Sequence, residues 1–130
     1  MITTEDMAVI VSEYLVEFGM PVYLKGHIPS GDIPEEGRIT ITPKEDSEGR
    51  IFDKCFIEIN FLFPDVNEEA DARLDGIERT AYGIFKGGFA GEYQGQHYDV
   101  SYSRRSREDD PKLKSHYVHF QLLFETLNTL

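Results

Sequence analysis

Residues 52–64, FDKCFIEINFLFP, constrain the fold of this chain more than any other segment, because apolar side chains occupy every second position. Successive side chains of a β-strand point to opposite faces of its sheet, so this spacing predicts a strand. Apolar residues also occur on the second face, which is typical of a central strand, and Pro64 ends the run. The continuous face consists of Cys55, Ile57, Ile59, Phe61 and Phe63, with Phe56 and Leu62 on the other.

Two amphipathic helices are predicted to flank this strand. Between Thr4 and Phe18 the apolar residues recur at helical spacing, and Gly19 with Pro21 ends the pattern. A second stripe runs from Ala70 to Phe85, with Asp65 or Asn67 as its N-cap and Gly87 and Gly88 after its last turn. Each helix therefore has one face to bury against a sheet.

Four further segments alternate apolar and polar residues, which indicates strands with one solvated face. The whole chain is predicted to form one α+β domain, residues 1–130, in the order helix-β-β-β-helix-β-β. Its sheet is mixed or antiparallel, both helices pack on one face, and residues 87–95 are a glycine-rich turn. The four segments are Val22 to Ile28, Arg38 to Thr42, His97 to Ser103 and Tyr117 to Phe124.

Two charged, turn-rich segments, residues 27–50 and 104–116, interrupt this pattern. Their prolines, glycines and acidic residues favour turns over regular structure. Connections in compact domains are usually about 4 to 6 residues long, so we expect two projecting loops, the second of them an overlong hairpin loop. Such loops either stay solvated or become ordered against a partner.

The formal net charge of -11 and the pI near 4.7 argue against a surface that binds nucleic acid by neutralising its phosphates. Residues 104–114 nevertheless hold five cations against three carboxylates, a net +2, which leaves -11 - 2 = -13 for the rest. This distribution favours contact between that segment and the acidic body of another copy, although a solvated, salt-bridged loop also fits it. The predicted subunit-contact residues are Arg104, Arg105, Arg107, Lys112 and Lys114.

The single cysteine, Cys55, excludes an internal disulfide bond, and its place in the apolar run favours a buried side chain in a reducing compartment. The first residues, MITTEDMAV, carry acids where a secretory signal would carry positive charge. No apolar run approaches the roughly 18 residues that span a bilayer. We therefore expect a soluble protein without membrane contact.

No sequence motif predicts catalysis or a cofactor. Phosphate-binding glycine loops, nucleophile elbows, HExxH and CxxC are all missing from the sequence. The one constellation that could hold a metal is His97, Asp99 and His119, on the polar faces of two strands predicted to be neighbours. Its spacing is unspecific, so solvated surface residues are the favoured interpretation and a non-enzyme is expected.

The order of the elements, with VYLKGHIPSGDIPEEGRITITP, FIEINFLFPD and VSYSRRSREDDPKLKSHYVHFQLLFET, resembles the tail terminator or tail completion proteins of long-tailed phages. The resemblance covers nearly the whole chain. It implies a ring, typically of six copies, that closes the tail tube and joins it to the head, with no catalytic residue. The partners implied are further copies, the tube and the head-tail connector.

This resemblance also implies roles for both charged segments. Residues 27–38 and 104–114 match the family's variable projecting loops, the first as a docking loop and the second as a subunit contact. The docking residues would be Pro29, Gly31, Asp32, Pro34 and Gly37. The protein would assemble in the bacterial cytoplasm and reside in the neck of the virion, where an acidic channel lets DNA pass without sticking.

Two other classes remain open. An acidic inhibitor that mimics DNA would explain the net charge, but it needs an uninterrupted ridge of carboxylates. The weaker alternative is a metal-dependent enzyme that uses His97, Asp99 and His119.

Overall fold

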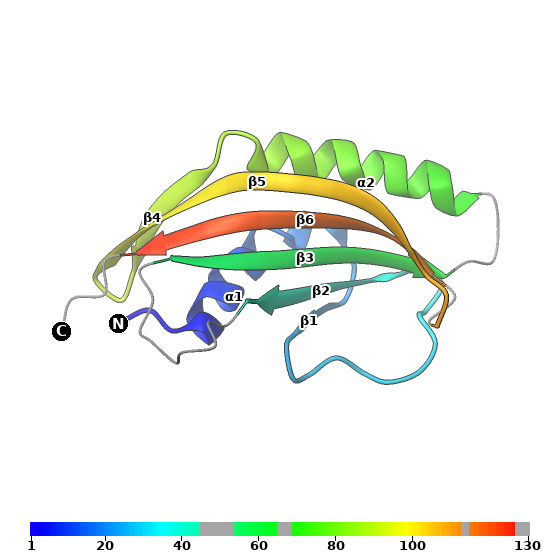
Figure 1. The fold of residues 1–130 in the computed structure, drawn as a ribbon, viewed down its shortest axis with the longest axis horizontal. Coiled ribbons are helices and arrows are strands. Elements are labelled where there is room, and N and C mark those ends of the chain that lie inside the picture. The colour runs from blue at the N-terminus through cyan, green and yellow to red at the C-terminus, as the bar shows by residue number, and fades with distance from the viewer. Residues whose placement is uncertain (45–53, 65–68, 113–114, 127–130) are drawn as a thin grey trace.

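The computed structural model describes residues 1–44, 54–64, 69–112 and 115–126 as a six-stranded mixed sheet with two α-helices (Figure 1). The strand order is β1-β2-β3-β6-β5-β4, in which β1 is parallel to β2 and every other pair is antiparallel. This architecture confirms the predicted α+β fold. The elements are α1 (Thr4–Glu13), a 3-10 turn (Val16–Phe18), β1 (Val22–Leu24), β2 (Arg38–Pro43), β3 (Lys54–Pro64), α2 (Glu69–Phe85), β4 (Phe89–Tyr93), β5 (Gln96–Asp110) and β6 (Ser115–Thr126).

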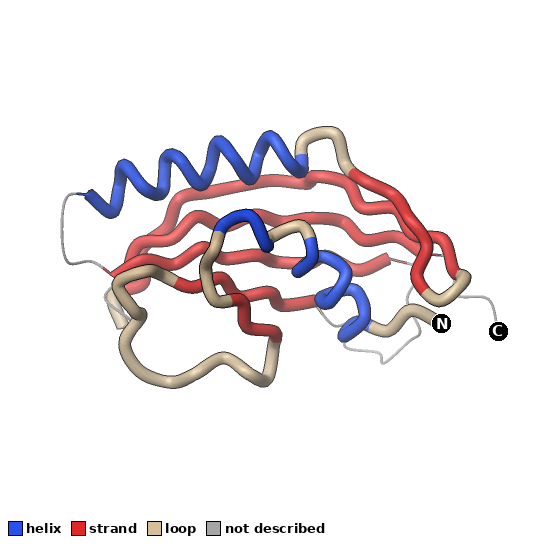
Figure 2. Tube along the Cα trace, turned by 180° about the vertical axis from the view of Figure 1, so that it is seen from behind, coloured by secondary structure: helices blue, strands red, loops and turns tan. Residues whose placement is uncertain are grey.

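Both helices pack on the same face of the sheet, as predicted. A single cluster of buried residues joins α1 and α2 to the strands, and β3 and β6 lie at its centre. Figure 2 shows α1 crossing the strands and α2 running along the length of β5. The side chains of this cluster that are fully inaccessible include Val11, Leu15, Ile57, Phe61, Leu74, Phe85, Phe120 and Phe124. No helix of the described residues lies over the other face, which we call the open face.

Capping and apolar spacing explain where α1 begins. Thr3 accepts a hydrogen bond from the backbone N–H of Asp6, and the Asp6 carboxylate accepts one from the backbone N–H of Thr3, a complete capping box. The α-helix ends at Glu13, earlier than predicted, and a 3-10 turn carries the chain to Gly19 at φ +63°. That turn still directs Phe18 onto Phe61.

Two predictions about the strands were wrong. The first strand, predicted from Val22 to Ile28, ends at Leu24; it is parallel to β2, and residues 25–37 cross from one end of the sheet to the other. Residues 89–93, predicted as part of a glycine-rich turn, form the edge strand β4. Phe89 and Tyr93 supply its apolar side, and both pack against the core.

The overlong hairpin loop predicted for residues 104–116 does not exist. β5 continues through the charged residues to Asp110, and β6 begins at Ser115, so Arg104 to Asp110 pair along β6. The sequence favoured a loop because these residues are mostly charged, a composition that is typical of loops. Pairing with the central strand β6 overrides that local preference.

Candidate subunit interface

A β-bulge at Ser103 decides where the charged half of β5 points. Tyr102 pairs with Leu122 and Arg104 pairs with Gln121, so Ser103 is one extra residue on β5. Before the bulge, Tyr98 and Val100 are buried in the core. After it, the odd-numbered residues take over that face, because Arg105 lies opposite Phe120 and Arg107 opposite Val118. Arg105 and Arg107 therefore point toward α2.

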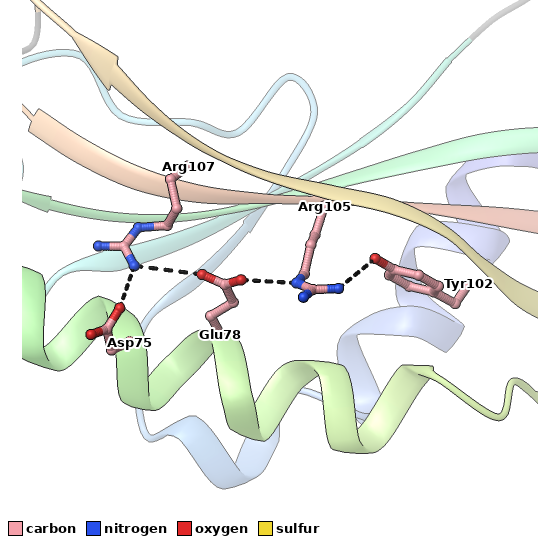
Figure 3. Close-up of polar contacts among 5 residues, drawn as sticks. All are labelled: Asp75, Glu78, Tyr102, Arg105 and Arg107. Atoms are coloured by element: carbon pink, nitrogen blue, oxygen red, sulfur yellow. Dashed lines mark hydrogen bonds and ion pairs between the residues drawn. The ribbon is translucent and has the colours of Figure 1, made fainter.

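The Arg105 guanidinium binds α2 and its own strand (Figure 3). Its Nε donates to Oε2 of Glu78 at 2.8 Å, and its Nη1 donates to the hydroxyl of Tyr102 at 3.1 Å. Its planar head also lies 4.5 Å from the centre of the Tyr82 ring. The hydrogen bond that Arg105 donates to Glu78 raises the pKa of Arg105 above its usual value, and the bond to Tyr102 raises it further.

Arg107 contacts three carboxylates of α2. Its guanidinium lies 2.6 Å from Oδ1 of Asp75, 3.5 Å from Oε1 of Glu78 and 3.6 Å from Oδ1 of Asp71. Burial lowers the pKa of Arg107, but the hydrogen bonds to Asp75 and Glu78 outweigh it and the net shift is upward. Two of the five predicted subunit-contact cations are thus engaged within their own chain, where they attach α2 to β5.

The remaining predicted contact residues differ from this pair. Arg104 is exposed on the open face opposite Gln121, and no described residue forms an ion pair with it. Lys112 is exposed at the hairpin turn, where its backbone N–H donates to Oδ1 of Asp110 at 3.0 Å. Lys114 lies outside the described residues. Arg104 and Lys112 are therefore the predicted contact cations that a neighbouring molecule can reach most directly.

The predicted docking loop is fixed to the body at its second end. Gly37 is buried with φ +79°, and a Cβ there would lie 2.7 Å from the carbonyl oxygen of Leu62, so only glycine fits. Its N–H donates to the carbonyl of Pro34 at 2.8 Å. Arg73 of α2 donates to the carbonyl of Glu35 at 3.1 Å. Pro34 and Gly37 thus have structural roles in this turn.

The middle of the loop is accessible. Pro29, Gly31 and Asp32 are exposed, and the Pro29 carbonyl accepts a hydrogen bond from Nη1 of the buried Arg38 at 3.1 Å. Gly31 has φ +106°, which glycine adopts without strain. Of the predicted docking residues, these three can meet a partner.

The strand register separates the three residues of the weak metal-site candidate, His97, Asp99 and His119. Nε2 of His97 lies 3.2 Å from Oδ2 of Asp99, but Asp99 pairs with Glu125 of β6, six residues from His119. At about 3.4 Å per residue, that separation is about 20 Å. His119 instead has Nδ1 2.7 Å from Oδ1 of Asn60. Within the described part of the chain, no group of three potential ligands could hold a metal ion.

The open face is less exposed to solvent than we expected from the polar residues of its strands. Thr40 and His119 are buried, and Glu58 lies 3.8 Å from Nε2 of His119 and 3.5 Å from Nζ of Lys44. Burial raises the pKa of Tyr117 on the same face, and the carboxylate of Glu108, which accepts its hydrogen bond, raises it further. These groups form a polar layer between the charged hairpin and β2.

No family model and no curated protein matches this chain. A solved structure whose name states no function has the same fold, with a TM-score of 0.60 and 10% sequence identity. The match covers 98% of this chain and 96% of the other. Among the described residues, no helix is long and apolar enough to cross a membrane.

Proposed function

We propose that this protein is a structural component of a phage or prophage tail, which associates with further copies of itself into a ring at the end of the tail tube. The observation that carries the proposal is the one-sided sheet. Both helices cover one face, while no helix of the described residues covers the open face, so each copy presents different surfaces in different directions. Head-to-tail association into a closed ring requires such a pair of unlike surfaces.

The projecting segments support the same function. The loop of residues 25–37 extends from the β1 side of the sheet, and the charged half of β5 lies on the far side of β6 (Figure 1). The resemblance to tail terminator proteins assigns contact roles to both segments. The ring would place carboxylates of a chain with net charge -11 around a channel, where they repel DNA phosphates and prevent sticking.

The DNA-mimic alternative has less support. Its ridge would need carboxylates without counter-ions, but Asp71, Asp75 and Glu78 of α2 are paired with Arg105 and Arg107. A metal-dependent enzyme would need His97, Asp99 and His119 at one site, but the strand register places His119 far from the other two. We therefore favour the ring, because it gives the two unlike faces of the sheet a role in assembly.

Electron microscopy of the purified protein mixed with isolated long-phage tail tubes tests the function. We expect density that closes one end of each tube and, by light scattering, a species of several copies. Bare tube ends together with a purely monomeric protein would overturn the proposal. Neighbouring genes give a second check, since tail-tube and tape-measure genes should flank this one and metabolic genes should not.

A further inference from the structure

Among the described residues, the outer edge of β5 has no strand partner along its charged half. β4 pairs with β5 only from Gln96 to Val100, and no described residue forms a backbone ladder with the outer side of Ser101–Asp110. Most side chains from Ser103 to Asp109 are exposed. An edge of this kind offers unpaired N–H and C=O groups to another chain, while its charges and its bulge prevent indiscriminate pairing.

A hollow of about 270 Å³ accompanies this edge, between β5 and α2. Its lining includes Arg79, Tyr82 and Arg105, with the carboxylates of Asp75 and Glu78 beside them. Tyr82 is 38% exposed, an unusual exposure for an aromatic ring. Arg79 has no ion-pair partner among the described residues, so together with Arg104 it leaves two unpaired cations at this edge.

The loop of residues 26–37 has complementary properties. It follows Lys25, the first residue of the connection between β1 and β2, and contains three exposed carboxylates, Asp32, Glu35 and Glu36, and no lysine or arginine. It also holds Ile28, which is 41% exposed and is followed by the exposed Pro29. The loop thus offers apolar surface for an aromatic ring and negative charge for two cations.

The loop and the β5 edge also lie where head-to-tail contact needs them. The strand order places the loop next to β1 at one side of the sheet and the free edge of β5 at the other (Figure 1). The end of the loop and the charged half of β5 also lie at the same position along the strand direction. Arg38, which follows the loop, pairs with Leu62, Leu62 pairs with Tyr117, and Tyr117 pairs with Glu108. A rotation about an axis along the strands would bring one copy's loop to the next copy's β5 edge.

We infer that the loop of residues 26–37 of one copy docks on the edge formed by β5 and α2 of the next copy. Ile28 and Pro29 pack on Tyr82, and the loop carboxylates approach Arg79 and Arg104. This inference rests on the proposed self-association and changes the role of the loop, from docking onto the head to contact between subunits. The contact is heterologous, so it repeats around a ring instead of ending at a dimer.

Site-directed cross-linking tests this pairing in the full-length chain. Two single-cysteine variants, Asp32→Cys and Arg104→Cys, are made with Cys55→Ala in both, mixed, and treated with a short thiol-specific cross-linker. We expect cross-linked dimers at least tenfold more abundant in the mixture than in either variant alone. Ser101→Cys, mixed with a cysteine at Glu13, an exposed residue of α1 outside the proposed contact, is the matched control and should give background levels.

A charge exchange provides an independent readout. Arg104→Glu should shift the assembled protein toward monomer in light scattering, and adding Asp32→Arg to the same chain should restore assembly in low salt. Efficient self-cross-linking of Arg104→Cys alone would instead indicate a symmetric β5–β5 contact and overturn the inference. Capped tubes without the loop-to-edge cross-link refute only this contact, whereas the cross-link without capped tubes refutes only the tail function.

Discussion

The two halves of β5 place opposite kinds of side chain on the same face of the sheet. From Gln96 to Tyr102 the inward residues are aromatic or aliphatic, and Tyr98 stacks on Phe124 with ring centres 5.2 Å apart. From Arg104 to Asp110 the inward residues include Arg105 and Arg107, which reach carboxylates of α2. One strand thus attaches to the rest of the molecule by apolar burial at one end and by ion pairs at the other.

This difference shows that exposure and charge do not by themselves identify a binding surface. Arg104, Arg105 and Arg107 are neighbours in the sequence, but the bulge at Ser103 turns two of them toward α2 and one toward the open face. The two inward arginines serve the fold, and the outward one is free for a partner. A single extra residue in the strand produces that division of roles.

The largest effect should come from a charge in the apolar half. Val100→Asp places a carboxylate at a position that is 3% exposed, and the loss in the free energy of unfolding should be about 3 kcal/mol or more. Urea denaturation measures it. Ser101→Asp, at the adjacent exposed position, is the control and should cost less than about 0.5 kcal/mol. Equal losses at both positions would contradict the assigned faces.

A smaller effect is expected in the charged half. Arg107→Ala removes the contacts with Asp71, Asp75 and Glu78 and should cost about 1 kcal/mol, less in high salt. Arg104→Ala, which breaks no ion pair in the described structure, should change stability by less than about 0.5 kcal/mol. A double-mutant cycle with Asp75→Ala should give a coupling energy of roughly 0.5 kcal/mol. Zero coupling would mean that the contact between Arg107 and Asp75 does not stabilise the packing of α2 on β5.

The smallest effect concerns the polar layer of the open face. Because the pKa of Tyr117 is raised above 10.0 in the folded state, the unfolded chain loses this proton first as the pH rises. The stabilisation is complete below pH 10 and declines as the pH rises through the folded-state pKa. Tyr117→Phe should make the loss of stability between pH 9 and pH 11 shallower, as followed by urea denaturation. An unchanged slope would show that Tyr117 is not held neutral by its surroundings.

Periodicity predicted the elements whose side chains form the core. The alternation in β3 and β6 and the helical stripe ending at Phe85 are regular, because each side of these elements meets a single environment. The second half of β5 could not be recognised in the same way. Its RRSREDD sequence has no apolar alternation, since the inward positions are satisfied by carboxylates that lie more than 25 residues earlier in the chain.

The residues of the candidate interface were likewise only partly predictable from the sequence. The sequence identified the cations of the second segment and the exposed residues of the loop, but not which of them were already engaged. Arg73 with Glu35 and Arg107 with Asp75 are contacts across 38 and 32 residues, which local composition does not reveal. Tyr82 and Arg79 escaped prediction because they lie on the polar side of a helix, where such residues are ordinary.

Short-range patterns of apolar and polar residues were thus sufficient to predict the α+β class, the central strand, the side on which the helices pack and the location of the charged segments, because these patterns decide what each element must bury. The parallel β1–β2 pairing, the register that separates His119 from Asp99, and the division of the three arginines between α2 and the open face became apparent only in the folded molecule. Those depend on strand pairing and on a bulge, and pairing energies arise between segments that the chain brings together only when it folds.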